Sequence, residues 1–165
     1  MADQILRKVN AAQVHLMFNH WPLILIAVAF FLLLFGERGQ NLTLKQWGLW
    51  LFVIAALFTI PSQFSGEGAE LIIEGLRDVD HELVEKHETL GFFSSMLAYG
   101  LGILSFISII MIHSTNSIYG AIRKLIIVGA AIGFVLMMLT AHSGGAISHP
   151  EIRSAISSSS WLFFT

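Results

Sequence analysis

Long apolar stretches alternate with short polar ones along this chain. Four apolar stretches begin near residues 15, 44, 90 and 125. A helix of about 20 apolar residues crosses the hydrocarbon core of a bilayer. The pattern therefore predicts an all-α integral membrane protein with spans at about 15–35, 44–64, 90–112 and 125–142. Short connectors favour an up-down-up-down four-helix bundle, and the four spans leave room for a single transmembrane domain over residues 1–165.

Local signals refine the ends of these helices. Pro22 lies one turn inside the first span, so either the transmembrane helix begins near Trp21 or it is kinked there. Asp80 is the expected N-cap of the third helix. Gly144-Gly145 is the expected end of the fourth.

The polar stretch from Phe64 to Gly91 separates the second and third spans and carries eight of the chain's eleven carboxylates. Because membrane-length segments flank it, we expect it at a membrane surface. Glu67, Glu70 and Glu74 recur on one side of a helix, which predicts that the second helix continues beyond the hydrocarbon. The stretch either docks a basic partner or is a solvated surface, as charge runs usually are.

Composition supports the membrane prediction and narrows the chemistry. Hydrophobic residues make up 55% of the chain, charged residues 12%, and the mean hydropathy is +0.74. No basic patch suggests nucleic acid. The absence of Cys excludes disulfides, thiolate metal sites, Fe–S clusters and covalently attached haem. Histidine, carboxylate and methionine remain as ligands for a metal or a non-covalent haem.

Most histidines are expected at one end of the bundle. The first and third spans begin there and the second and fourth end there; we call this the histidine end. Six of the seven histidines belong to it, and His113 lies at the other end. Ionisable residues in membrane segments are costly and generally face the bundle interior. His20, His87 and His142 thus offer three imidazoles at about the same depth, although a histidine at an interface needs no function.

Two further histidines accompany these three. His15 precedes His20 by five residues, about 140° around a helix, so both cannot face the bundle axis unless Pro22 distorts the turn. His149 follows His142 beyond the glycine pair and is equally ambiguous. Each can be a ligand or a group that supports one.

Four short motifs occur in order along the chain and, taken together, have a familiar form. They resemble the H-P-x-x-V-H-F-P opening, T-G-x-x-A segment, H-E-x-x-G helix start and H-x-G-G-x-L-T-H close of a bacterial family of small four-helix predicted membrane proteins. The corresponding segments here are His15 to Pro22, Ser65 to Ala69, His87 to Gly91 and His142 to His149. The resemblance covers nearly the whole chain. The chain departs from the family pattern with Asn19 before His20 and Pro150 after His149.

Some members of that family are fused to c-type cytochrome domains. The resemblance therefore implies a redox setting, the bacterial inner membrane, and other membrane or periplasmic redox subunits as partners, a c-type cytochrome among them. It also implies haem-related roles for five histidines: His15, His20, His87, His142 and His149.

Cations suggest the orientation in the membrane. The two connectors at the end opposite the histidines are the denser in cations, which favours a cytoplasmic position for that end. The histidine end and both termini would then be external. The cations concerned are Arg38, Lys45, Arg123 and Lys124.

The leading functional hypothesis is a membrane b-type cytochrome that transfers electrons as a subunit of a larger complex, not as a stand-alone enzyme. Two imidazoles from different helices would hold the iron of haem b axially. His20 and His87 are the expected axial pair, because diagonal helices one and three commonly supply such ligands. His15, His142 or His149 would bind a second haem or the haem propionates.

Two alternatives stay open. The first is a metal site for transport or sensing, with His20, His87, His142 and Glu67 binding Zn, Fe or Cu. The second is a cofactor-free structural subunit of a membrane redox complex. The apolar spans predict the lipid bilayer as the surrounding medium in all three cases.

Overall fold

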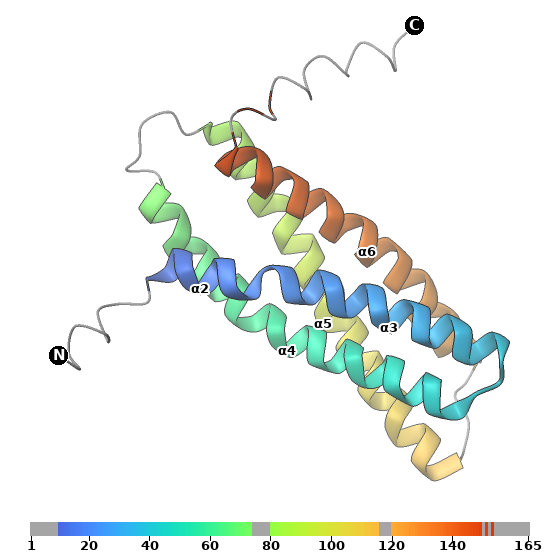
Figure 1. Cartoon of the computed structure of the whole chain (residues 1–165). Coiled ribbons are helices and arrows are strands. Elements are labelled where there is room, and N and C mark those ends of the chain that lie inside the picture. The colour runs from blue at the N-terminus through green and yellow to red at the C-terminus, as the bar shows by residue number, and fades with distance from the viewer. Residues whose placement is uncertain (1–9, 74–79, 116–119, 150, 152, 154–165) are drawn as a thin grey trace, which may run out of the picture.

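The computed structural model describes residues 10–73, 80–115, 120–149, 151 and 153, and this part of the chain is all-helical. The helices are α2 (Ala11–Phe18), α3 (His20–Arg38), α4 (Leu42–Ile73), α5 (His81–Thr115) and α6 (Gly120–Ser148) (Figure 1). Four segments are long and apolar enough to cross a membrane: Ala11–Arg38, Leu42–Ile73, His81–Thr115 and Gly120–Ser148. The predicted fold class, an all-α membrane protein with four spans, is confirmed.

The first span is broken into α2 and α3 at Asn19. Pro22 explains the break, because it has no N–H to offer the carbonyl of Phe18 four residues earlier and its ring clashes with that carbonyl. The Asn19 backbone N–H instead closes α2 on the His15 carbonyl at 2.9 Å. The prediction of a helix boundary near Pro22 is confirmed.

The other helix ends agree with the sequence in part. Asp80 caps α5, since its Oδ1 accepts hydrogen bonds from the Glu82 and Leu83 backbone N–H groups. Helix α4 extends past Phe64 to Ile73, as the glutamate spacing predicted, and Glu74 lies outside the described residues. The expected end at Gly144-Gly145 is wrong, because α6 continues to Ser148.

The four long helices form a ring. Helix α3 packs on α4 and α6, and α5 packs on the same two helices, so α3 and α5 lie on one diagonal and α4 and α6 on the other. Fully buried side chains of all four helices form the core, while large apolar side chains cover the outer surface. This distribution suits a bundle surrounded by lipid. Core residues include Ile26, Leu33, Phe52, Leu101 and Ile126.

Contacts between helix ends support an arrangement in which successive helices run in opposite directions, up-down-up-down. Which end of the bundle faces the cytoplasm stays a prediction. At the end opposite the histidines, Glu37 of α3 forms ion pairs with Lys45 of α4 and Arg123 of α6, each at 3.2 Å. At the histidine end, His87 near the start of α5 contacts Thr140 near the end of α6. Neighbouring helices thus meet start to end.

Candidate functional site: a facing pair of histidines

His15 lies on α2 and points toward α4. Its ring nitrogen Nδ1 is 2.9 Å from the carbonyl oxygen of Ser62. A carbonyl oxygen only accepts, so Nδ1 carries the proton and donates it. In a neutral ring of this tautomer the other nitrogen, Nε2, has a free lone pair, which is the form that binds a metal.

His87 lies on α5 and is anchored by α6 in the same way. Its Nδ1 donates to the carbonyl oxygen of Thr140 at 2.9 Å and lies 3.1 Å from the Ser143 hydroxyl oxygen. That hydroxyl itself donates to the Thr140 carbonyl at 2.8 Å. His87 is therefore also a Nδ1–H imidazole with a free Nε2.

The two rings are neighbours inside the bundle and lie in a T-shaped arrangement. Their centroids are 6.2 Å apart and their planes are inclined by 81°. One ring comes from the helix that continues into α3 and the other from α5, which are the diagonal pair. Both rings are half-buried. The structure thus brings together two imidazoles from different helices, each with its Nδ1 bonded to a main-chain carbonyl.

Aromatic packing fixes the position of α2. The Phe18 and Trp21 rings, on either side of the break at Asn19, each lie 5.7 Å from the Phe58 ring of α4. The end of α2 and the start of α3 are thereby held on one side chain of α4. This contact keeps His15 within reach of Ser62, one turn along α4 from Phe58.

The other predicted histidines lie elsewhere. His20 begins α3 just after the break and is exposed, as are His142 and His149. The predicted axial pair, His20 with His87, is not the pair that the structure brings face to face. The two side chains are five residues apart, about 140° around a helix, so His20 points to another side when His15 faces α4.

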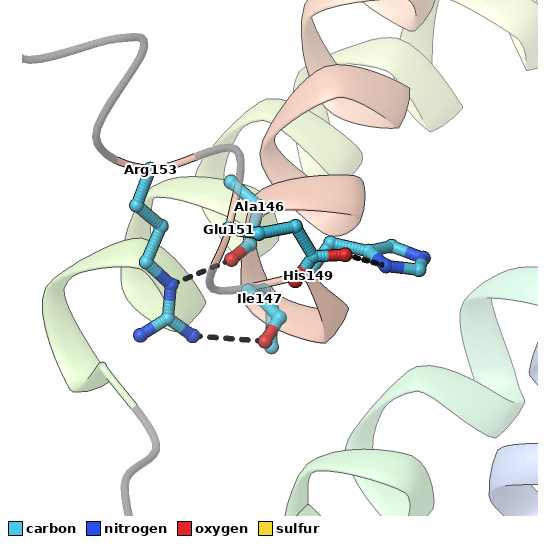
Figure 2. Close-up of polar contacts among 5 residues, drawn as sticks. All are labelled: Ala146, Ile147, His149, Glu151 and Arg153. Carbon is cyan, nitrogen blue, oxygen red and sulfur yellow. Dashed lines mark hydrogen bonds and ion pairs between the residues drawn. The ribbon is translucent and has the colours of Figure 1, made fainter.

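His149 belongs to a cluster at the end of α6, shown in Figure 2. Its Nδ1 lies 2.9 Å from a carboxylate oxygen of Glu151. A hydrogen bond from its own backbone N–H, together with the one from His149, lowers the pKa of Glu151 below its usual range. Beside this pair, the Arg153 guanidinium donates to the carbonyls of Ala146 and Ile147 at 2.8 and 2.9 Å. These bonds cap the last turn of α6, since basic side chains suit helix C-termini.

The predicted metal set of His20, His87, His142 and Glu67 is not gathered. Within the described residues, no group of three or more His, Asp or Glu side chains is arranged to hold an ion. Glu67 is exposed on α4. One turn further along α4, Glu70 lies beside Glu88 of α5. Along the chain, Glu67 and Glu70 follow Gly66 and Glu88 follows His87, so these carboxylates border the histidine pair.

Sequence reasoning missed His15 as the partner of His87, and it missed both anchoring carbonyls. A main-chain carbonyl has no sequence signature of its own. One available signal was Pro22, which ends the preceding helix and so separates His15 from His20. Comparison of the chain with protein families, with curated proteins and with solved structures finds no match in any of the three.

Proposed function

We propose that this protein is a membrane b-type cytochrome-like electron-transfer subunit with one haem b held axially by His15 and His87. The observation that carries the proposal is the facing pair of imidazoles, each with Nδ1 bonded to a main-chain carbonyl. Metal-binding histidines almost always donate their other ring N–H in this way, which fixes the tautomer and the ring orientation.

The separation of the rings suits a metal between them. An imidazole nitrogen binds a protein metal ion at about 2 Å, so two such bonds and the ring radius on either side come to about 6 Å. The ring centroids are 6.2 Å apart.

The number of ligands favours haem over a bare ion. Zinc takes three or four protein ligands, whereas the iron of haem has four nitrogens from the porphyrin and takes one or two ligands from the protein. The described residues offer two facing imidazoles and no third ligand near them in an ion-binding group. A haem held there by His15 and His87 would supply one-electron transfer.

The proposal keeps the haem expected from the sequence but replaces His20 with His15 in the axial pair. The resemblance to a family with members fused to c-type cytochrome domains points to the same redox setting. We propose that the partners are membrane or periplasmic redox subunits, and that the acidic border of the site lies on the side from which such a partner approaches.

A visible spectrum tests the proposal. We expect the protein purified in detergent to show a sharp α-band in the dithionite-reduced minus oxidised spectrum and a haem b signature in the pyridine haemochrome assay. His15→Ala and His87→Ala should each abolish the band. His20→Ala and His142→Ala, which remove exposed imidazoles of the same end, are the matched controls and should retain it.

Three other results would each contradict the proposal in a different way. Loss of the band in His20→Ala with retention in His15→Ala would restore the pair expected from the sequence. A colourless wild-type protein containing stoichiometric Zn, Fe or Cu would overturn the haem proposal in favour of a metal site. A folded wild-type protein with neither haem nor metal would make the chain a structural subunit.

A further inference from the structure

The two histidines are anchored by the same short motif on two different helices. On α4 the anchoring carbonyl belongs to Ser62, and Ser65 and Gly66 follow three and four residues later. On α6 the carbonyl belongs to Thr140, and Ser143 and Gly144 follow at the same spacing. We call this pattern, Ser/Thr-x-x-Ser-Gly, the anchoring motif.

The contacts within the two motifs correspond as well. The Ser65 hydroxyl lies 3.1 Å from the Ser62 carbonyl oxygen and 2.6 Å from that of Pro61, and the Ser143 hydroxyl lies 2.8 Å from the Thr140 carbonyl oxygen. In both cases the same carbonyl accepts from a histidine ring. Each glycine lies beside that ring, because the nearest atoms to an added Cβ belong to His15 at Gly66 and to His87 at Gly144.

The correspondence extends along α4 and α6. The two helices begin at Leu42 and Gly120, 78 residues apart, and the same offset relates the two anchoring motifs. It also relates five of the six buried positions of α4 to buried positions of α6. These pairs are Gly48 with Ile126, Phe52 with Ala130, Ala55 with Gly133, Thr59 with Met137 and Ser65 with Ser143.

Helices α3 and α5 correspond in the same way. His15 and His87 are 72 residues apart. The residue 72 positions after each buried residue of α3 is a buried residue of α5. The pairs are Pro22 with Ser94, Ile26 with Ala98, Ala29 with Leu101, Leu33 with Ser105 and Gly36 with Ser108. The residue types differ almost throughout, which is why no repeat is evident in the sequence.

The opposite end of the bundle shows the same relation. Lys45 of α4 and Arg123 of α6 are 78 residues apart, and each pairs with a different oxygen of the Glu37 carboxylate at 3.2 Å. Rotation by half a turn about the bundle axis exchanges diagonal helices, so it exchanges α3 with α5 and α4 with α6. The two cations thus occupy equivalent positions around one carboxylate.

We infer that the chain consists of two copies of one helix-pair unit, α2 to α4 and α5 to α6, related by an approximate two-fold axis, and that each copy supplies one histidine and one anchoring motif. Ser65 and Ser143 are then equivalent positioning residues, which hold the two anchoring carbonyls. The assignment of these serines to haem binding rests on the proposed function, whereas the two equivalent motifs do not.

The two copies differ in how closely the glycine approaches the ring. A Cβ at Gly144 would lie 2.9 Å from Cε1 of His87, which is closer than non-bonded carbons approach, whereas a Cβ at Gly66 would lie 3.8 Å from the His15 ring, an ordinary contact. Gly144→Ala should therefore displace His87 from Thr140. Gly66→Ala should leave His15 in place and is its matched control.

The tautomers of the rings test the two motifs without haem. In ¹⁵N-histidine-labelled protein freed of haem, long-range ¹H–¹⁵N NMR should show two neutral rings protonated at Nδ1, identified as His15 and His87 by their alanine variants. We expect Gly144→Ala to remove the signal of His87 alone and Gly66→Ala to retain both. Protonation of either ring at Nε2 in the wild type would overturn the inference, whatever the result with haem.

Haem titration tests the equivalence of the serines. We expect Ser65→Ala and Ser143→Ala each to weaken haem binding about 10-fold, the lower end of the effects seen for groups that orient a metal ligand. Ser143→Thr should restore binding by returning the hydroxyl. Ser108→Ala removes a buried helical serine far from the pair and should leave haem binding unchanged. If haem binding falls in only one of the two serine variants, the copies are not equivalent. If the wild type binds no haem, the proposed function is contradicted, and the NMR experiment remains the test of the two motifs.

Discussion

Ser105 lies in the core of α5 with its side chain fully buried, and its hydroxyl has no hydrogen-bond partner among the described residues. Three residues later, Ser108 is equally buried, but its hydroxyl donates to the Leu104 carbonyl at 2.8 Å. A buried polar group that makes no bond costs free energy, and removing it recovers part of that cost. The two serines therefore differ in what they contribute to stability.

We expect Ser105→Ala to raise the free energy of unfolding by about 1 kcal/mol, because it removes an unsatisfied hydroxyl and leaves a side chain of similar size. Ser108→Ala removes a satisfied hydroxyl and should be neutral or slightly destabilising. Thermal unfolding in detergent, followed by circular dichroism, measures both. Equal loss of stability in the two variants would mean that the Ser105 hydroxyl has a partner in the protein.

At the scale of helices, the break between α2 and α3 lies between the two histidines of the first span. His15 lies four residues before the break, and its carbonyl receives the last hydrogen bond of α2 from Asn19. In one continuous helix, the side chains of His15 and His20 would point about 140° apart around the helix axis. In the structure His15 lies against Ser62 while His20, on the other side of the break, is exposed.

Pro22→Ala tests the role of this break. The alanine N–H can bond the Phe18 carbonyl, so α2 and α3 should merge into one helix and carry His15 away from Ser62. We expect haem affinity to fall at least 10-fold while helix content is unchanged or slightly higher. Circular dichroism measures helix content and haem titration measures affinity. His20→Ala is the control, because it changes a residue next to the break but keeps Pro22. Unchanged haem binding in a merged helix would show that the break does not position His15.

The sequence predicted correctly the features that depend on residues close together along the chain. Apolar stretches predicted the four spans, Asp80 predicted the start of α5, and the spacing of Glu67 and Glu70 predicted the extension of α4. Gly144-Gly145 misled, because glycine was expected to end a helix, whereas Gly144 here gives the His87 ring room against α6. The pairing of His15 with His87 depends on contacts between helices, which local patterns do not contain.

At the scale of the whole molecule, the two ends of the bundle have different chemistry. One end has the facing imidazoles with carboxylates beside them, and the other has cations gathered on Glu37. Connectors rich in Lys and Arg are usually retained in the cytoplasm. This asymmetry matters for the proposed function, since a haem near one membrane surface exchanges electrons with partners on that side.

Single cysteines test the orientation cleanly, because the chain has no cysteine of its own. Glu85→Cys places an exposed thiol at the histidine end, and Gln40→Cys places one at the other end. In intact bacterial cells, a membrane-impermeant maleimide should label Glu85→Cys, while Gln40→Cys should react only after lysis. The denser cations of the connectors at the Gln40 end are the reason. The reverse pattern would put the histidine pair on the cytoplasmic side, and a periplasmic cytochrome could then not be the direct redox partner.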